Sequence, residues 1–176
     1  MTRYRDKDWS ARFASLGDEA EGVFLDVRPL GPAQRLGWKR PQVTMRLMPP
    51  ALKHLPDYYT ASGFLVEVMG MGSDGVMKLK LSKWEALKFW NALSPVALFL
   101  WNSGVQQWRL IPWQSLRTLV RRARSAGVQA FENDGNEYYP IQWAWITADR
   151  EVISDAEKVQ LPTEEGDSDR PGLAAR

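Results

Sequence analysis

The sequence contains no cysteine and only one histidine, His54, and these two scarcities exclude several kinds of site. Without cysteine the chain cannot form disulfides, bind zinc through thiolates or use a cysteine nucleophile. With one histidine it cannot build a multi-histidine metal centre, and Ser-His-Asp catalysis would have to use His54. A metal ion would therefore be held mainly by carboxylates, a ligand set that favours magnesium or manganese.

A long hydrophobic run is also lacking. The strongest one, PVALFLW from Pro95, is far too short to cross a bilayer. The first ten residues, MTRYRDKDWS, are rich in charge and are not followed by an apolar stretch, unlike a signal peptide. We therefore expect a cytoplasmic protein without a membrane partner.

The net charge is small, +2 over 176 residues, but it is unevenly distributed. Residues 151–176 hold seven acids and three bases, a net charge of −4, which leaves +6 on residues 1–150. The length and the hydrophobic content of 44% indicate one globular domain over residues 1–150. The acidic segment 151–176 loses apolar periodicity, and we expect it to be a disordered tail. A mildly basic body is compatible with a nucleic-acid partner.

The order of apolar patterns along the chain predicts an α/β fold with a central sheet and helices on both of its faces. The run from Pro95 reads as a strand buried on both faces, because it is apolar without alternation. The predicted elements are helix 8–27, strands 43–48, 64–69 and 76–81, helix 83–93, strands 95–101 and 107–113, helix 113–126 and a last strand within 133–146.

Two carboxylates stand out in the stretch PDYYTASGFLVEVMG, residues 56–70. Glu67 lies in the middle of an apolar strand, and Asp57 precedes it by ten residues. A buried, unpaired carboxylate is costly, so Glu67 needs a cation or a hydrogen-bond partner. A hairpin through residues 58–63 would place Asp57 beside Glu67, and a divalent cation is the usual reason to keep two carboxylates together.

Lysines follow in the next strand. Segment 76–81 is expected to return antiparallel to segment 64–69 across the turn GMGSDG. Depending on the register, Lys78 or Lys80 then lies opposite Glu67 on the same face. Either register places an ammonium beside the glutamate. Lys83, at the start of the next helix, is a further candidate after these two lysines.

These residues resemble the active-site pattern of the PD-(D/E)XK nuclease superfamily, most closely its phage-type and Holliday-junction-resolvase-like members. The matching residues are Pro56-Asp57 and Glu67-Val68, followed by a helix and the apolar strand from Pro95. The segment LGDEAEGVF, residues 16–24, resembles the superfamily's opening helix. The resemblance covers roughly residues 8–150. Met69 departs from it, because the family pattern has a lysine at that position.

The resemblance implies a restriction-endonuclease-like fold, with a mixed central β-sheet flanked by helices on both faces. It implies a Mg²⁺-dependent DNA nuclease, with Mn²⁺ as a substitute, that hydrolyses phosphodiester bonds in phage or bacterial recombination, repair or DNA processing. The metal ligands would be Asp57, Glu67, Glu21 and the Val68 carbonyl. Lys78 or Lys80 would assist catalysis. The DNA could be single-stranded, duplex or branched, and the chain could act as a homodimer. If the chain is phage-encoded, it would act in the cytoplasm of the bacterial host.

Two basic patches are candidate DNA contacts. Arg117, Arg121 and Arg124 recur at helical spacing and would track a DNA backbone, although a solvated helix face explains them about equally well. The loop RLGWKRP is the second patch, where an exposed tryptophan between cations could stack on an unpaired base; its members are Arg35, Trp38, Lys39 and Arg40. Two alternative functions stay open: a catalytically inactive DNA-binding module on the same fold, and a protein-interaction domain.

Overall fold

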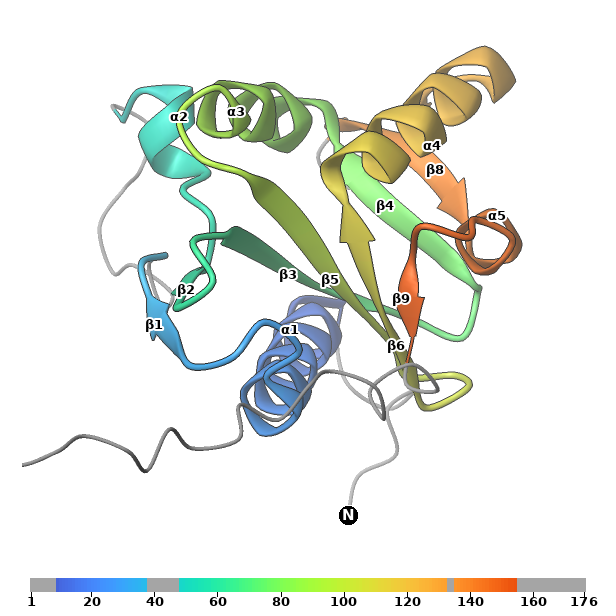
Figure 1. The fold of residues 1–176 in the computed structure, drawn as a ribbon. Coiled ribbons are helices and arrows are strands. Elements are labelled where there is room, and N and C mark those ends of the chain that lie inside the picture. Colours follow the sequence, from blue (N-terminus) through green and yellow to red (C-terminus); the bar gives the residue numbers. More distant parts are fainter. Residues whose placement is uncertain (1–8, 38–47, 133–134, 155–176) are drawn as a thin grey trace, which may run out of the picture.

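Two sheets and five helices make up the described part of the chain, residues 9–37, 48–132 and 135–154 of a computed structural model (Figure 1). In chain order the elements are α1 (Trp9–Val27), β1 (Ala33–Arg35), α2 (Pro50–Lys53), β2 (Tyr58–Thr60), β3 (Leu65–Met71), β4 (Val76–Lys80), α3 (Leu81–Asn91), β5 (Val96–Asn102), β6 (Gln107–Pro112), α4 (Trp113–Ala126), β7 (Gln129–Ala130), β8 (Glu137–Gln142), α5 (Trp143–Thr147) and β9 (Ile153–Ser154).

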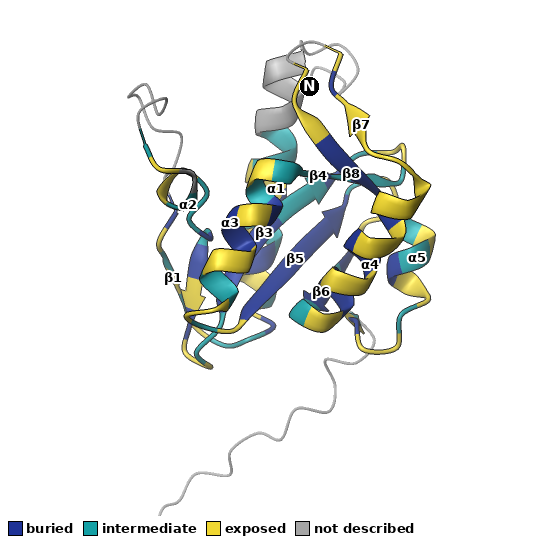
Figure 2. Cartoon of the chain, turned by 90° about the horizontal axis from the view of Figure 1, so that it is seen from above, coloured by how far each residue is buried: buried dark blue, intermediate teal, exposed yellow. Residues whose placement is uncertain are grey.

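The main sheet has six strands in the order β1-β2-β3-β5-β6-β9 and is mixed. Strands β3 and β5 run parallel, and every other neighbouring pair in this sheet is antiparallel. A parallel pair needs a crossover between its strands, and β4 with α3 provides it. Strand β5 lies at the centre and is buried along its whole length (Figure 2), as its uninterrupted apolar sequence predicted.

Helices cover both faces of this sheet. Helix α1 packs on one face, and α3 and α4 lie across the other (Figure 1). The alternation along β3 divides its side chains between the two layers, because successive strand residues point to opposite faces. Val66 and Val68 join the α1 side, whereas Leu65 and Met71 join the α3–α4 side. Glu67 has the parity of Leu65 and therefore points toward α3. The predicted α/β fold with a mixed sheet is confirmed.

The expected antiparallel pairing of segment 76–81 with segment 64–69 is wrong. Strand β4 pairs instead with β8, in a second sheet of order β4-β8-β7. On one edge β5 pairs with the whole of β3, and on the other edge β2 pairs with Leu65 and Val66 while the Asp57 carboxylate accepts the Val68 N–H. After the turn at Gly75, which has a positive φ of 66°, the chain therefore leaves the main sheet.

The remaining differences lie at element ends. Helix α1 runs through Gly17 without a break. The last predicted strand ends at Gln142, where α5 begins, so Trp143 and Trp145 are helical. Strand β9 pairs with β6 and carries the fold past the expected boundary at residue 150. Residues 43–47 of one predicted strand and 155–176 of the predicted tail lie outside the described residues. No described helix combines the length and apolarity that a membrane crossing requires.

Candidate active site

Asp57 lies at the start of a β-hairpin. It directly precedes β2, which pairs with β3 so that Tyr58 faces Val66, and the predicted hairpin is thereby confirmed. The Asp57 Oδ2 atom accepts a hydrogen bond of 2.9 Å from the backbone N–H of Val68. Its carbonyl oxygen accepts two more, from the N–H groups of Leu36 at 2.8 Å and Gly37 at 3.1 Å. Main chain and side chain of Asp57 are therefore both fixed against the residues that follow β1 and those within β3.

Glu67 lies beside Asp57 and is almost completely buried, with 1% of its surface exposed. Burial, together with the neighbouring Asp57 carboxylate, raises the pKa of Glu67 to about 8. The pKa of Asp57 is also raised, mainly by burial. Burial and the repulsion between the two carboxylates outweigh the effect of the nearby Lys83 ammonium, which lowers the pKa of Glu67, so its pKa stays raised.

Lys83 supplies a cation at this point. It lies in the first turn of α3, and its Nζ atom donates a hydrogen bond to Glu67 Oε1 and forms an ion pair with it. Burial alone would lower the pKa of Lys83, but the nearby carboxylates of Glu67 and Asp57 outweigh this effect and raise it. The side chain keeps 26% of its surface exposed, so the ammonium joins the buried carboxylates to the solvent side of the site.

Lys78 and Lys80, the lysines predicted to face Glu67, are positioned elsewhere. Both lie on β4, whose pairing with β8 removes the expected opposition to β3. Lys78 forms an ion pair of 2.9 Å with Asp74 in the preceding turn. The Lys80 ammonium lies 5.2 Å from the centre of the Phe131 ring. The ammonium that hydrogen-bonds Glu67 is thus the one from α3.

Met69 occupies the strand position at which the family pattern has its lysine, and it has a structural role. Its side chain is partly buried and packs against the core cluster between the sheet and α3–α4. Because Lys83 approaches the same carboxylates from the helix, an ammonium is present although the strand does not supply one.

Glu21, the third predicted metal ligand, has other partners. It forms an ion pair with Arg35 on β1, and the Tyr58 hydroxyl lies 3.5 Å from its Oε2 atom. Among the described residues, no three histidine, cysteine or acidic side chains gather closely enough to hold a metal ion. Glu21 therefore does not complete a three-carboxylate set with Asp57 and Glu67.

The donor set that remains fits one hard divalent cation. Two adjacent carboxylates and the nearby main-chain carbonyl of Val68 are all oxygen ligands, the type that Mg²⁺ and Mn²⁺ prefer. Mg²⁺ commonly binds through one or two carboxylates and keeps several waters, so a third acidic residue is not required. Burial is the main cause of the raised pKa of Glu67, and repulsion by Asp57 is the second; a divalent charge would relieve that repulsion.

The predicted arginine stripe lies on the exposed face of α4. Arg117, Arg121 and Arg124 are exposed, and none of them forms an ion pair with an acid within the part of the chain that the structure describes. The sequence of α4 contains no acidic residue. A fourth arginine, Arg122, stacks over the Trp145 ring of α5, with its Cζ atom 4.3 Å from the ring centre. The other predicted patch, Trp38, Lys39 and Arg40, lies outside the described residues.

Two features of the site escaped the sequence patterns. Lys83 was only a distant candidate, and its position in the first turn of a helix that follows the carboxylate strand was the available signal. Arg35 was assigned to an exposed loop patch, but it lies on β1 and pairs with Glu21. Comparison of the chain with protein-family models, with curated proteins and with solved structures finds no match.

Proposed function

We propose that this chain is a divalent-metal-dependent DNA nuclease of the PD-(D/E)XK type, with a restriction-endonuclease-like fold. In this proposal Lys83 takes the place of the lysine expected at Met69. The observation that carries it is the convergence of Asp57, Glu67 and Lys83 on one point beside the central sheet. A sheet core gains nothing from a buried carboxylate pair and an ammonium, so their retention supports a chemical role.

The residues divide the work by their chemistry. Asp57 and Glu67, with the Val68 carbonyl, would hold Mg²⁺ or Mn²⁺. Bound there, the cation supplies an acidified water as nucleophile and positive charge next to the phosphodiester. Lys83 uses one ammonium N–H on Glu67 and has two further donors, which can bind a phosphate oxygen and stabilise the negative charge that develops on it.

Support for the fold assignment comes from the arrangement of the elements around this point. The opening helix α1, the carboxylate hairpin and the crossover to a buried parallel strand follow the order that the superfamily resemblance implies. The biological setting, recombination, repair or processing of phage or bacterial DNA, rests on that resemblance. So does the possibility that the DNA is branched and that the chain acts as a homodimer.

A cleavage assay tests the proposal. The full chain is incubated with end-labelled single-stranded, duplex, forked and four-way-junction DNA in Mg²⁺, in Mn²⁺ and in EDTA. Asp57→Ala, purified in parallel, controls for a contaminating nuclease. We expect metal-dependent cleavage by the wild-type chain and none by the variant. DNA that is bound but uncut would indicate the inactive DNA-binding module, and a chain that neither binds nor cuts would indicate a protein-interaction domain.

A further inference from the structure

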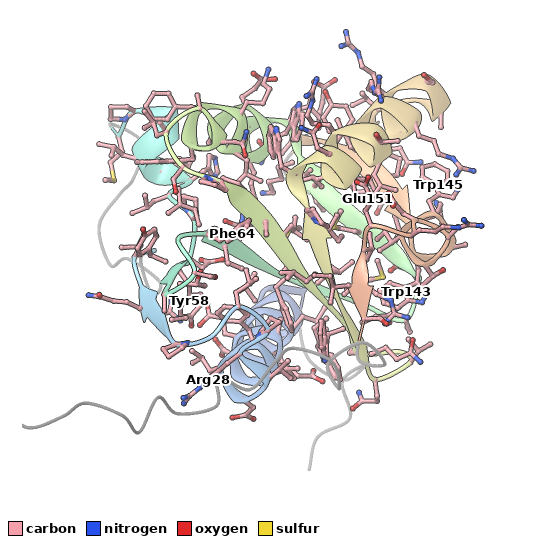
Figure 3. All side chains as sticks on the ribbon, viewed as in Figure 1. Arg28, Tyr58, Phe64, Trp143, Trp145 and Glu151 are labelled. Atoms are coloured by element: carbon pink, nitrogen blue, oxygen red, sulfur yellow. The ribbon has the colours of Figure 1, made fainter. Side chains whose placement is uncertain are left out.

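A second charged cluster lies beside the candidate active site. Arg35 forms an ion pair with Glu21, and its NH2 group donates a hydrogen bond of 2.8 Å to the Tyr58 hydroxyl. Its guanidinium also stacks over the Tyr58 ring, with Cζ 5.0 Å from the ring centre. Tyr58, which is labelled in Figure 3, lies on β2. Its ring packs against that of Phe24 on α1, so the arginine is supported by both β2 and α1. These contacts fix the orientation of the guanidinium plane.

This cluster is directly connected to Asp57. Arg35 is the last residue of β1, and the next two residues, Leu36 and Gly37, donate their N–H groups to the Asp57 carbonyl. The charges of Arg35 and Glu21 act on the pKa of Asp57 in opposite directions, the cation lowering it and the glutamate raising it. Asp57 therefore lies between two carboxylate–cation pairs, one with Lys83 and one with Arg35.

The guanidinium has hydrogen-bonding capacity that the protein does not use. Both interactions with Glu21 and Tyr58 are made by NH2, whereas the buried NH1 group has no acceptor within the residues that the structure describes. Leaving a buried donor unpaired is unfavourable. The Arg35 side chain as a whole keeps 29% of its surface exposed, so a phosphate oxygen can approach the guanidinium from the solvent side while Glu21 keeps its place on the other edge.

We propose that Arg35 is a phosphate-binding residue of the nuclease, which contacts the nucleic-acid backbone next to Asp57 while Glu21 and Tyr58 hold its guanidinium in place. The inference rests on the proposed function and adds to it the residue that receives the substrate's charge. In this arrangement Glu21 serves the site as the anchor of Arg35.

Because Arg35 and Glu21 carry opposite charges, removing one or the other should change the affinities for phosphate and for a divalent cation in opposite directions. Removing the arginine charge makes the surroundings of Asp57 more negative, which weakens phosphate binding and strengthens the binding of a divalent cation. Removing the glutamate charge has the reverse effects on both ligands. Loss of local structure would instead weaken both ligands together, so the signs separate an electrostatic role from a structural one.

The experiment measures two affinities on the full chain and its variants. Fluorescence anisotropy with a labelled single-stranded oligonucleotide in EDTA gives the DNA affinity without cleavage. Calorimetric titration with Mn²⁺ gives the metal affinity without DNA. The variants are Arg35→Met, Arg35→Lys and Glu21→Gln. Arg28→Met is the matched control, because Arg28 is exposed and, among the described residues, its side chain donates only to the Leu25 carbonyl. Thermal unfolding of each variant monitors the fold.

We expect Arg35→Met to weaken DNA binding about tenfold, the size of a charged hydrogen bond, without weakening Mn²⁺ binding. Arg35→Lys should recover part of the loss, and Glu21→Gln should weaken Mn²⁺ binding while DNA binding is retained or improved. Unchanged DNA affinity in Arg35→Met, or parallel losses of both ligands, would overturn the inference. If the wild-type chain cleaves DNA in Mg²⁺ but Arg35→Met binds DNA normally, only the inference fails; a wild-type chain that binds no DNA overturns the proposed function as well.

Discussion

At the residue scale, the main fact is that Glu67 is buried next to a second carboxylate and a lysine. Its pKa of about 8 in the fold compares with an ordinary value of 4.5. The raised pKa means that the folded chain binds this proton more tightly than the unfolded chain does. The stabilisation linked to the proton is therefore complete below the unfolded pKa and is lost as the pH rises through the folded pKa.

This linkage predicts the pH dependence of stability. The contribution of Glu67 to the free energy of unfolding falls as the pH rises from about 4.5 to about 8. Between about pH 6.5 and 8, in EDTA, the free energy of unfolding of the wild-type chain should therefore fall, and that of Glu67→Gln should fall less. Asp57 acts in the same direction, because its pKa is also raised. His54, whose pKa is lowered to about 4, acts only below this window, since its neutral form is favoured in the fold. Urea unfolding at several pH values measures the two slopes, and equal slopes would contradict the assignment of a retained proton to Glu67.

Lys83 gives a second prediction at this scale. Lys83→Met should abolish cleavage while DNA is still bound, because the ammonium beside Glu67 is removed. Lys88→Met is the matched control, since Lys88 lies on the same helix and pairs at the surface with Glu85. Without Lys83, Glu67 is a buried carboxylate that lacks its cation, and this destabilises the fold. Thermal unfolding of the variant must therefore accompany the assay. Cleavage at the wild-type rate by Lys83→Met would show that another residue supplies the cation.

The sequence revealed the acids of this site better than it revealed the bases. Asp57 and Glu67 could be paired because a hairpin between them is a local structure, defined by the turn and the alternation in β3. The position of Lys83 depends on where α3 packs, which the pattern of that helix alone does not determine. Lys78 and Lys80 were favoured only because β4 was assumed to pair with its neighbour in sequence, whereas it pairs with β8.

At the element scale, α1 approaches β3 through a glycine. A Cβ atom at Gly70 would lie 2.5 Å from the carbonyl oxygen of Leu16, far inside the contact distance. Gly70→Ala should therefore displace α1 and destabilise the fold by about 1–3 kcal/mol. Gly22→Ala is the control, because nothing lies within 4 Å of a Cβ there and alanine favours a helix. Denaturant unfolding measures both, and an unchanged midpoint for Gly70→Ala would contradict the close packing.

The next prediction concerns Leu36 and Gly37, which follow β1 and donate their N–H groups to the Asp57 carbonyl. A Cβ atom at Gly37 would lie 2.9 Å from the Cα atom and 3.0 Å from the Oδ1 atom of Asp57. Gly37→Ala should therefore move the aspartate and weaken Mn²⁺ binding more than it lowers the unfolding temperature. Calorimetry and thermal unfolding of the same preparation give the two quantities. Normal metal affinity in this variant would mean that the Asp57 carboxylate is not a ligand.

Elements with a strong local pattern were predictable from the sequence, and their partners were not. The long helix, the buried run of β5 and the helix with the arginine stripe occur close to where the patterns placed them. The end of β8 was missed because WAWIT is apolar enough to read as strand, although it forms α5. The two-residue strand β9 was missed because so short a segment carries no periodicity.

At the scale of the whole molecule, the exposed face of α4 is where the proposed function would place DNA. Helix α4 presents its arginines without neighbouring acids on the helix itself, so their field is not cancelled locally. Affinity for duplex DNA falls as the salt concentration rises, and the steepness of that fall reports the number of phosphates that the protein neutralises. We predict that a variant with glutamine at Arg117, Arg121 and Arg124 shows a shallower fall. The slope of log affinity against log salt concentration should decrease in magnitude by about 0.9 for each phosphate that is no longer neutralised. The same three positions changed to lysine should retain the slope. A slope unchanged in the glutamine variant would place the DNA elsewhere.

The parallel pairing of β3 with β5 has a consequence for the order in which the chain folds. Leu65 pairs with Val96 across the whole of β4 and α3, so this pairing forms only after the entropy of closing a long crossover has been overcome. Asp57 and Glu67 belong to the early, local hairpin, whereas Lys83 belongs to the crossover helix that packs against β5. A partly synthesised chain that ends before β5 therefore contains all three groups but not their arrangement. The growing chain therefore carries Asp57, Glu67 and Lys83 in an unassembled form until β5 has paired with β3.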